Sequence, residues 1–318
     1  MAQWQPDILG DDYQMKYIHH ANDYSGPVRS SIIKKTSLIS NGIGVLYIHG
    51  YNDYFFQKEL GDQFTKHGIN FYATDLRKYG RSIVNRNTMF EVRDLSEYYA
   101  DIDSALYIMK ADGISNIFIM GHSTGGLIAT LYVKNHPDKT LKGLILNSPF
   151  YEWNMSKFMK YVLIPIVGAI GNVFPNISIP QGENTAYGES LLKDFHGEWE
   201  YNRNWKLMQS PPVRSGWLQA INKAHDDILI GERIKIPILL MHSDKSIYGN
   251  KWDESFNCGD AVLNVQDISI IGERIGYNIT EAIVVDGLHD LTLSRKDVRN
   301  AVYCCIFRWI NGIIPLSH

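Results

Sequence analysis

Cysteine is scarce in this sequence. The 318 residues include only Cys258, Cys304 and Cys305, two of which are adjacent. This number excludes a disulfide framework, and no C-x-x-C pair or helical histidine–carboxylate motif suggests a metal site. We therefore expect neither a metal nor another cofactor.

Strong charge and long apolar runs are missing as well. The net charge of −3 gives no general attraction to nucleic acid or to anionic lipid. The longest apolar segment, 161–174, is interrupted by Pro165, Gly168 and Gly171 and is too short to cross a bilayer. The first residues lack the basic and apolar regions of a secretory signal peptide. We expect a soluble, cytoplasmic protein without a nucleic-acid partner or transmembrane segment, and the sequence leaves its oligomeric state open.

Apolar runs and helical patterns alternate along most of the chain. Segments 13–20 and 28–35, separated by turn-forming residues, predict an antiparallel hairpin at a sheet edge. Six further apolar runs are typical of parallel strands covered on both faces: 44–49, 69–75, 117–120, 141–146, 237–241 and 282–285. Helical spacing predicts helices over 53–67, 95–113 and 124–135, and around 298–309. The chain is therefore predicted to form an α/β fold with a doubly wound, mostly parallel, eight-stranded sheet.

The alternation stops between residues 148 and 232. This region is rich in aromatic residues and shows no regular succession of strand and helix. We predict that 1–148 and 233–318 form the core and that 149–232 form an inserted, largely helical cap.

The most informative motif lies within 117–129. An apolar run leads into Gly121-His122-Ser123-Thr124-Gly125, a G-x-S-x-G pattern, and helix-forming residues follow. This order is typical of a nucleophile elbow, in which a serine occupies a sharp turn between a strand and a helix. The glycines lack Cβ, so chain segments can pass close to the strained turn. Ser123 is the predicted nucleophile, whereas His122 is expected to point away from it and to pack.

A serine nucleophile needs a base and an acid that orients the base, and in such folds they follow in the order Ser, Asp or Glu, His. His289 follows the strand at 282–285 on the edge of the sheet where the elbow lies, so it is the predicted base. Asp244 comes directly after the strand at 237–241, and Asp260 precedes an apolar segment that leads into a helix. We favour Asp260, with 246–259 as an inserted loop, and keep Asp244 as the alternative acid.

Backbone N–H groups are expected to stabilise an oxyanion. Thr124 follows the nucleophile and supplies one of them. The second is predicted at Tyr51, because Gly50 permits a tight turn after the strand at 44–49.

Together these motifs resemble those of the α/β-hydrolases, in the branch of monoacylglycerol lipases, lysophospholipases and serine aminopeptidases. The resemblance covers almost the whole chain and rests on 49–51, 75–82, 121–126 and 287–290. There are two departures. Lys78 stands where the family usually has glycine, and Ser246 stands where the acid usually lies. Reading 246–259 as an insertion aligns Asp260 with the family's acid.

The expected function is that of a serine hydrolase acting on a carboxylic ester, such as a lipid or lysophospholipid acyl ester, through an acyl-enzyme. The cap aromatics and segment 162–174 would line the acyl site. Two alternatives remain: a catalytically silent ligand-binding protein, and an aminopeptidase that would hold the substrate's amino terminus with cap carboxylates. The carboxylates that could bind this amino terminus are those of Glu183, Glu189, Glu198 and Glu200.

Overall fold

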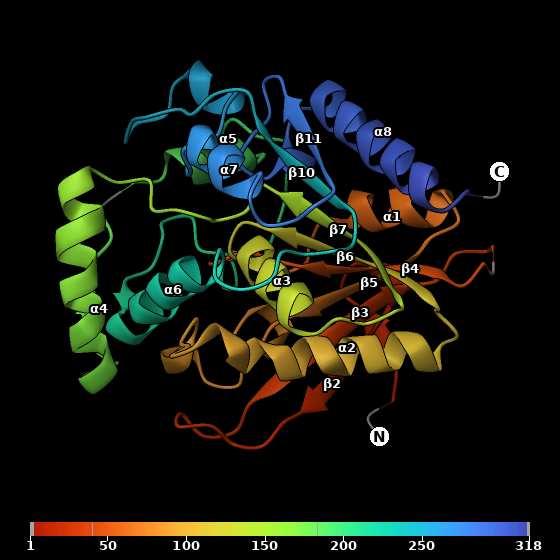
Figure 1. Ribbon diagram of the computed structural model, residues 1–318, viewed down its shortest axis with the longest axis horizontal. Coiled ribbons are helices and arrows are strands. Elements are labelled where there is room, and N and C mark those ends of the chain that lie inside the picture. The colour runs from red at the N-terminus through yellow and green to blue at the C-terminus, as the bar shows by residue number, and fades with distance from the viewer. Residues whose placement is uncertain (1–2, 40, 183, 317–318) are drawn as a thin grey trace.

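The computed structural model describes residues 3–39, 41–182 and 184–316, and a mixed sheet with helices on both faces forms its centre (Figure 1). Three antiparallel strands come first in the sheet and six mutually parallel strands follow. The prediction of a doubly wound, mostly parallel α/β sheet is confirmed. The order of the strands in space is β1 (Gln5–Asp7), β2 (Gly10–His19), β3 (Arg29–Lys35), β5 (Asn70–Asp75), β4 (Ile43–Ile48), β6 (Asn116–His122), β7 (Leu141–Asn147), β10 (Ile238–Ser243) and β11 (Ile279–Val284).

The sheet of the described residues has nine strands, where the sequence predicted eight. The additional strand, β1, has three residues and begins where Gln5 pairs with Met15 of β2. Asp7 at its end binds Arg81, with 2.7 Å between Asp7 Oδ2 and Arg81 Nε, and Arg81 also binds Asp75 at 2.9 Å. A tertiary ion pair therefore fixes a strand that is too short to show a periodic pattern.

Side chains of the central strands alternate between two cores, one on each face of the sheet. Val45 and Tyr47 of β4 pack with α1 (Lys58–Lys66) and α8 (Lys296–Ile313). Leu46 and Ile48 belong to the opposite core, which includes α2 (Tyr99–Ala111), α3 (Thr124–Asn135) and α7 (Val265–Gly272). Burial on both faces is why β4 is apolar throughout rather than alternating.

Helix α1 begins at Lys58, so the prediction of a helix from residue 53 was wrong. The preceding residues use their polar groups in tertiary contacts instead. The Asp53 carboxylate lies 3.0 Å from Lys206 Nζ, and the Phe55 N–H donates to Asp75 Oδ1 at 2.8 Å. These contacts hold 53–57 in an irregular loop at the carboxyl edge of the sheet.

The chain between β7 and β10 combines helices with two short strands and long irregular stretches. It contains a π-helical turn at Met159–Leu163, α4 (Ile164–Val173), β8 (Ser178–Ile179), α5 (Ala186–Leu191), β9 (Val213–Arg214) and α6 (Ser215–Asp227). Helices α4 and α6 lie side by side at one end of the molecule (Figure 1). Helix α4 exposes Ile166, Ile170 and Val173. The division into a core and a cap stays a prediction. In the described ranges, no helix has both the length and the apolar content needed to cross a membrane.

Candidate active site

Ser123 occupies a strained turn between β6 and α3. Its φ of 52° and ψ of −121° lie outside the regions that residues with a Cβ prefer. A Cβ added at Gly125 would lie 2.3 Å from the carbonyl oxygens of Ile48 and His49. Glycine at this position therefore lets α3 start close against the end of β4, and the turn raises Ser123 at the carboxyl edge of the sheet.

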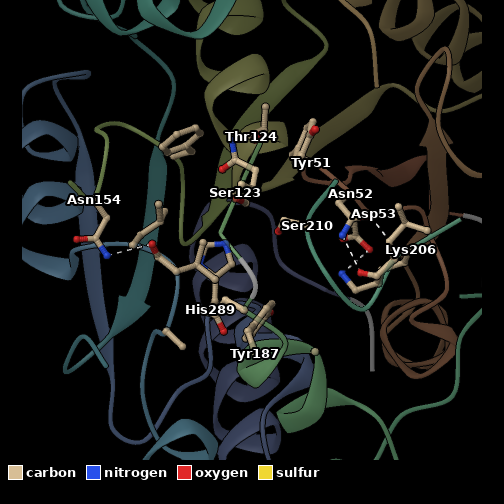
Figure 2. A pocket seen from close by; sticks show the side chains of 18 of the residues that line it. Tyr51, Asn52, Asp53, Ser123, Thr124, Asn154, Tyr187, Lys206, Ser210 and His289 are labelled. Carbon is tan, nitrogen blue, oxygen red and sulfur yellow. Dashed lines mark hydrogen bonds and ion pairs between the residues drawn. The ribbon is translucent and has the colours of Figure 1, made fainter. Parts of the chain in front are cut away.

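Ser123 and His289 line one cavity of about 640 Å³ (Figure 2). Both are largely buried, with exposed fractions of 9% and 4%. His289 lies in the loop that follows β11, as the sequence predicted from the order of the elements. Within the described part of the chain no hydrogen bond joins the two side chains, and such contacts often tighten only when substrate binds.

The carboxylate of Asp260 lies beside the His289 ring. Oδ2 of Asp260 is 2.9 Å from Nδ1 of His289, and Oδ1 accepts the N–H groups of Val262 and Leu263 at 2.8 Å each. Asp260 is fully buried. Because the carboxylate can only accept here, the hydrogen bond places a proton on Nδ1 and leaves Nε2 free to accept one.

Asp244, the alternative acid, does not contact His289. It is exposed, and its Oδ1 accepts the N–H of Asp286 at 2.9 Å. The loop after it closes on itself, because the Asp260 N–H donates to Lys245 O at 3.0 Å and the Ile247 N–H donates to Asp260 O at 2.7 Å. Residues 246–259 thus form a loop whose two ends, at Lys245 and Asp260, lie side by side.

Tyr51 and Thr124, the predicted oxyanion donors, lie near Ser123. Both residues line the cavity around Ser123 (Figure 2). A Cβ added at Gly50 would lie 3.0 Å from Ser123 Cβ, which brings the turn before Tyr51 close to the serine. Thr124 is the first residue of α3, where the N–H has no partner within the helix. Among the described residues, neither amide donates a hydrogen bond to the protein.

His122 was expected to point away from Ser123 and to pack, and its ring packs beside that of His289. The centroids of the two rings are 4.8 Å apart, and His122 lines the cavity. Its Nδ1 lies 3.1 Å from the carbonyl oxygen of Asn147. Burial lowers the pKa of His122 below its usual value, although the neighbouring Asp290 acts in the opposite direction.

A polar wall on the far side of the cavity was not foreseen from the sequence. It carries Asp53 and Lys206, which form a buried ion pair, and Oδ2 of Asp53 has no hydrogen-bond partner among the residues that the structure describes. Lys206 was missed because a lone lysine in an irregular segment carries no motif. Asp53 was missed because the pattern around it indicated a helix.

Asp53, His122 and Asp290 each bring one possible metal-ligand atom to within 4.8 Å of the others. The fit to a metal ion is poor, because the oxygens of Asp290 already accept hydrogen bonds and Asp53 is paired with Lys206.

The carboxylates that an aminopeptidase would need are engaged elsewhere. Glu189 accepts a hydrogen bond from the hydroxyl of Thr185. Glu198 binds Arg299, and Glu200 binds Lys193. In the described part of the chain, Glu189, Glu198 and Glu200 do not line the cavity. Glu183 lies outside the described residues.

Lys78 has a φ of 69°, a left-handed backbone conformation in which glycine is favoured. This explains why the family pattern has glycine at its position. The Lys78 ammonium forms an ion pair with Asp23, with 2.7 Å between Nζ and Oδ2.

The strand order, the strained serine turn and the histidine after the last strand define an α/β-hydrolase. Residues 43–250 match the family model described as serine aminopeptidase, S33. This match covers more than half of the chain, and the protein belongs to that family.

Named relatives point to the same branch. The chain is 23% identical to a probable lysophospholipase L2 of Haemophilus influenzae, over 80% of this chain and 78% of that protein. It is 31% identical to phospholipase YtpA of Bacillus subtilis, over 63% of this chain and 74% of the relative. The fold is similar to that of a soluble variant of monoglyceride lipase from Saccharomyces cerevisiae, with a TM-score of 0.69, 17% identity and coverage of 95% and 96% of the two chains. The protein is thus a serine hydrolase of the lipase and esterase type, in the monoacylglycerol lipase and lysophospholipase-like branch.

Proposed function

We propose that the protein hydrolyses the acyl ester of a single-chain lipid, such as a lysophospholipid, with Ser123, His289 and Asp260 as its catalytic triad. The observation that carries the proposal is the 2.9 Å contact between His289 Nδ1 and the buried Asp260, in the cavity that holds the strained Ser123. A serine, an oriented base and a buried acid are the components that acyl transfer requires.

In the proposed first step, His289 Nε2 takes the proton of Ser123 Oγ while that oxygen attacks the ester carbonyl. The amides of Tyr51 and Thr124 would stabilise the oxyanion, each typically contributing roughly 2.7–4 kcal/mol to lowering the barrier. His289 then gives its proton to the departing alcohol, which leaves an acyl-enzyme. Water, deprotonated by His289, attacks this ester. The bond from the acyl carbon to Ser123 Oγ then breaks, His289 returns its proton to Oγ, and the fatty acid is released. Asp260 would keep its hydrogen bond to the Nδ1 proton and so hold the ring in place throughout.

The two walls of the cavity support an amphiphilic substrate. Phe150, Trp153 and Leu263 make one part of the lining apolar, and Asp53 and Lys206 make another part polar. In Figure 2 the Asp53–Lys206 pair lies to one side of Ser123 and His289. An acyl chain would occupy the apolar side and the polar alcohol would face Lys206, whose ammonium has hydrogen-bond donors beyond the one used by Asp53.

A fluorophosphonate probe and p-nitrophenyl esters of increasing chain length test the triad. The probe should label the protein once, and Ser123→Ala should abolish both labelling and hydrolysis. His289→Ala should lower kcat by roughly 10²–10⁴, the usual effect of losing a general base. Undiminished labelling of Ser123→Ala, or near-full activity of folded His289→Ala, would refute the assignment. Aminoacyl-arylamides in the same assay report on the aminopeptidase alternative, and we expect no turnover of them.

The polar wall is tested by replacing both members of the ion pair, so that no charge is left buried alone. Asp53→Asn with Lys206→Met should lower kcat/KM for a lysophospholipid at least tenfold, since a hydrogen bond to a charged group contributes about 1.5–3 kcal/mol. Hydrolysis of p-nitrophenyl butyrate, which has no such head group, should change less than about twofold. Equal losses on both substrates would mean that the wall does not select the head group.

A further inference from the structure

Asn147 stands between the two loops that the proposed mechanism must align. It is the last residue of β7 and is fully buried. Its carbonyl oxygen accepts the N–H of Ser123 at 3.0 Å and lies 3.1 Å from Nδ1 of His122. The backbone of Asn147 therefore holds the elbow.

The side chain of Asn147 holds the loop that carries His289. Its Nδ2 donates to Asp290 Oδ1 at 2.8 Å, and its Oδ1 accepts the N–H of Leu291 at 3.1 Å. These are the two residues that directly follow the histidine. One residue thus binds the nucleophile from one side and the base loop from the other.

The Asp290 carboxylate is itself fixed. Oδ1 also accepts from the N–H and the hydroxyl of Thr292, at 3.0 and 2.7 Å, and Oδ2 accepts from Gln57 Nε2 at 3.1 Å. Burial alone would raise the pKa of Asp290, but the neighbouring His122 and these hydrogen bonds outweigh it, and the pKa is lowered. Asp290 is ionised at neutral pH. Its side chain does not line the cavity, so its contacts serve to hold the loop in place.

We propose that Asn147 is a positioning residue, which sets the distance between Ser123 and His289 by linking the elbow to the base loop; this inference rests on the proposed function. An amide is required, because the side chain must donate to a carboxylate and accept from an N–H at once. Side-chain misplacement of about 1 Å in an active site can cost about 10² in rate.

The test is the steady-state kinetics of Asn147→Ala with a short p-nitrophenyl ester. We expect kcat to fall about 10²-fold. KM should change less than about twofold, because Asn147 does not line the cavity and a residue that acts only on the chemical step leaves binding unchanged. The rate of fluorophosphonate labelling should fall in parallel with kcat.

Asn70 offers a matched control at the start of β5, away from the carboxyl edge. It is also buried, accepts the N–H of Ser37 at 3.1 Å and donates to Ile43 O at 3.1 Å. Asn70→Ala should lower the melting temperature about as much as Asn147→Ala while changing kcat less than about twofold. If the two variants lose kcat equally, or if Asn147→Ala keeps full kcat, the positioning role is refuted.

Asn147→Asp keeps the shape and the acceptor but loses the donor, which covers the case in which Asn147→Ala does not fold. The introduced carboxylate would face Asp290, and the two would share a proton at low pH. Relative to the wild type, activity should be restored as the pH falls and lost as it rises. A constant ratio across the pH range would overturn the proposal. Activity remaining in Ser123→Ala would instead refute the proposed function.

Discussion

Replacing Asp260 by asparagine should inactivate the enzyme without removing any atom that packs. Oδ1 of Asp260 faces the N–H groups of Val262 and Leu263, so only the carbonyl oxygen of an amide can lie there. The amide nitrogen is then turned towards His289 Nδ1, in the place of Oδ2. Both nitrogens cannot donate to one another, so Nδ1 must accept.

The consequence is the wrong tautomer of His289. With Nδ1 accepting, the ring proton moves to Nε2, which then cannot take the proton of Ser123. The equivalent exchange in serine proteases lowers kcat by about 10⁴, and a loss of roughly 10³–10⁴ is expected here. Since each decade corresponds to about 1.36 kcal/mol, the barrier would rise by about 4–5.5 kcal/mol.

The assay is kcat and kcat/KM with a p-nitrophenyl ester, alongside urea unfolding to show that the variant is folded. Asp244→Asn is the matched control, because its contact with the N–H of Asp286 needs only an acceptor oxygen, which the amide retains. It should lose less than about threefold. A larger loss in Asp244→Asn than in Asp260→Asn would reverse the choice of acid. Mild effects in both would mean that the triad is incomplete and would favour a ligand-binding protein.

Two further predictions concern stability. Burial lowers the pKa of His225 from 6.5 to about 4, so the unfolded chain binds more protons than the folded chain between these values. The free energy of unfolding should therefore be highest above pH 6.5 and decrease by roughly 3 kcal/mol as the pH falls towards 4. His225→Gln should flatten this part of the urea-unfolding profile. Arg81→Met leaves the carboxylates of Asp7 and Asp75 buried and unpaired, and should cost about 3–5 kcal/mol in urea unfolding. A loss below about 1 kcal/mol would show that water reaches both carboxylates.

Much of this protein was determined by local sequence. The strand at Ile43–Ile48 is apolar throughout because both of its faces are buried, and this is visible in the sequence itself. The glycines around Ser123 have no substitute, because a Cβ at Gly125 would overlap backbone oxygens. The position of His289 follows from the order of the strands, since the carboxyl ends of parallel strands share one edge. Fold class, elbow and predicted base could therefore be inferred from patterns of a few residues each.

Tertiary contacts decided the rest. Asp244 and Asp260 both come after β10 in the sequence. Only the closure of the loop between them determines which carboxylate reaches His289. Helix α1 starts late because Asp53 binds Lys206, more than a hundred residues further along the chain. Asn147 carries no motif, and its role depends on four partners at the end of β6, in the elbow and in the loop after β11. These pairings join residues far apart in the chain, so their energies depend on distances that no local pattern encodes.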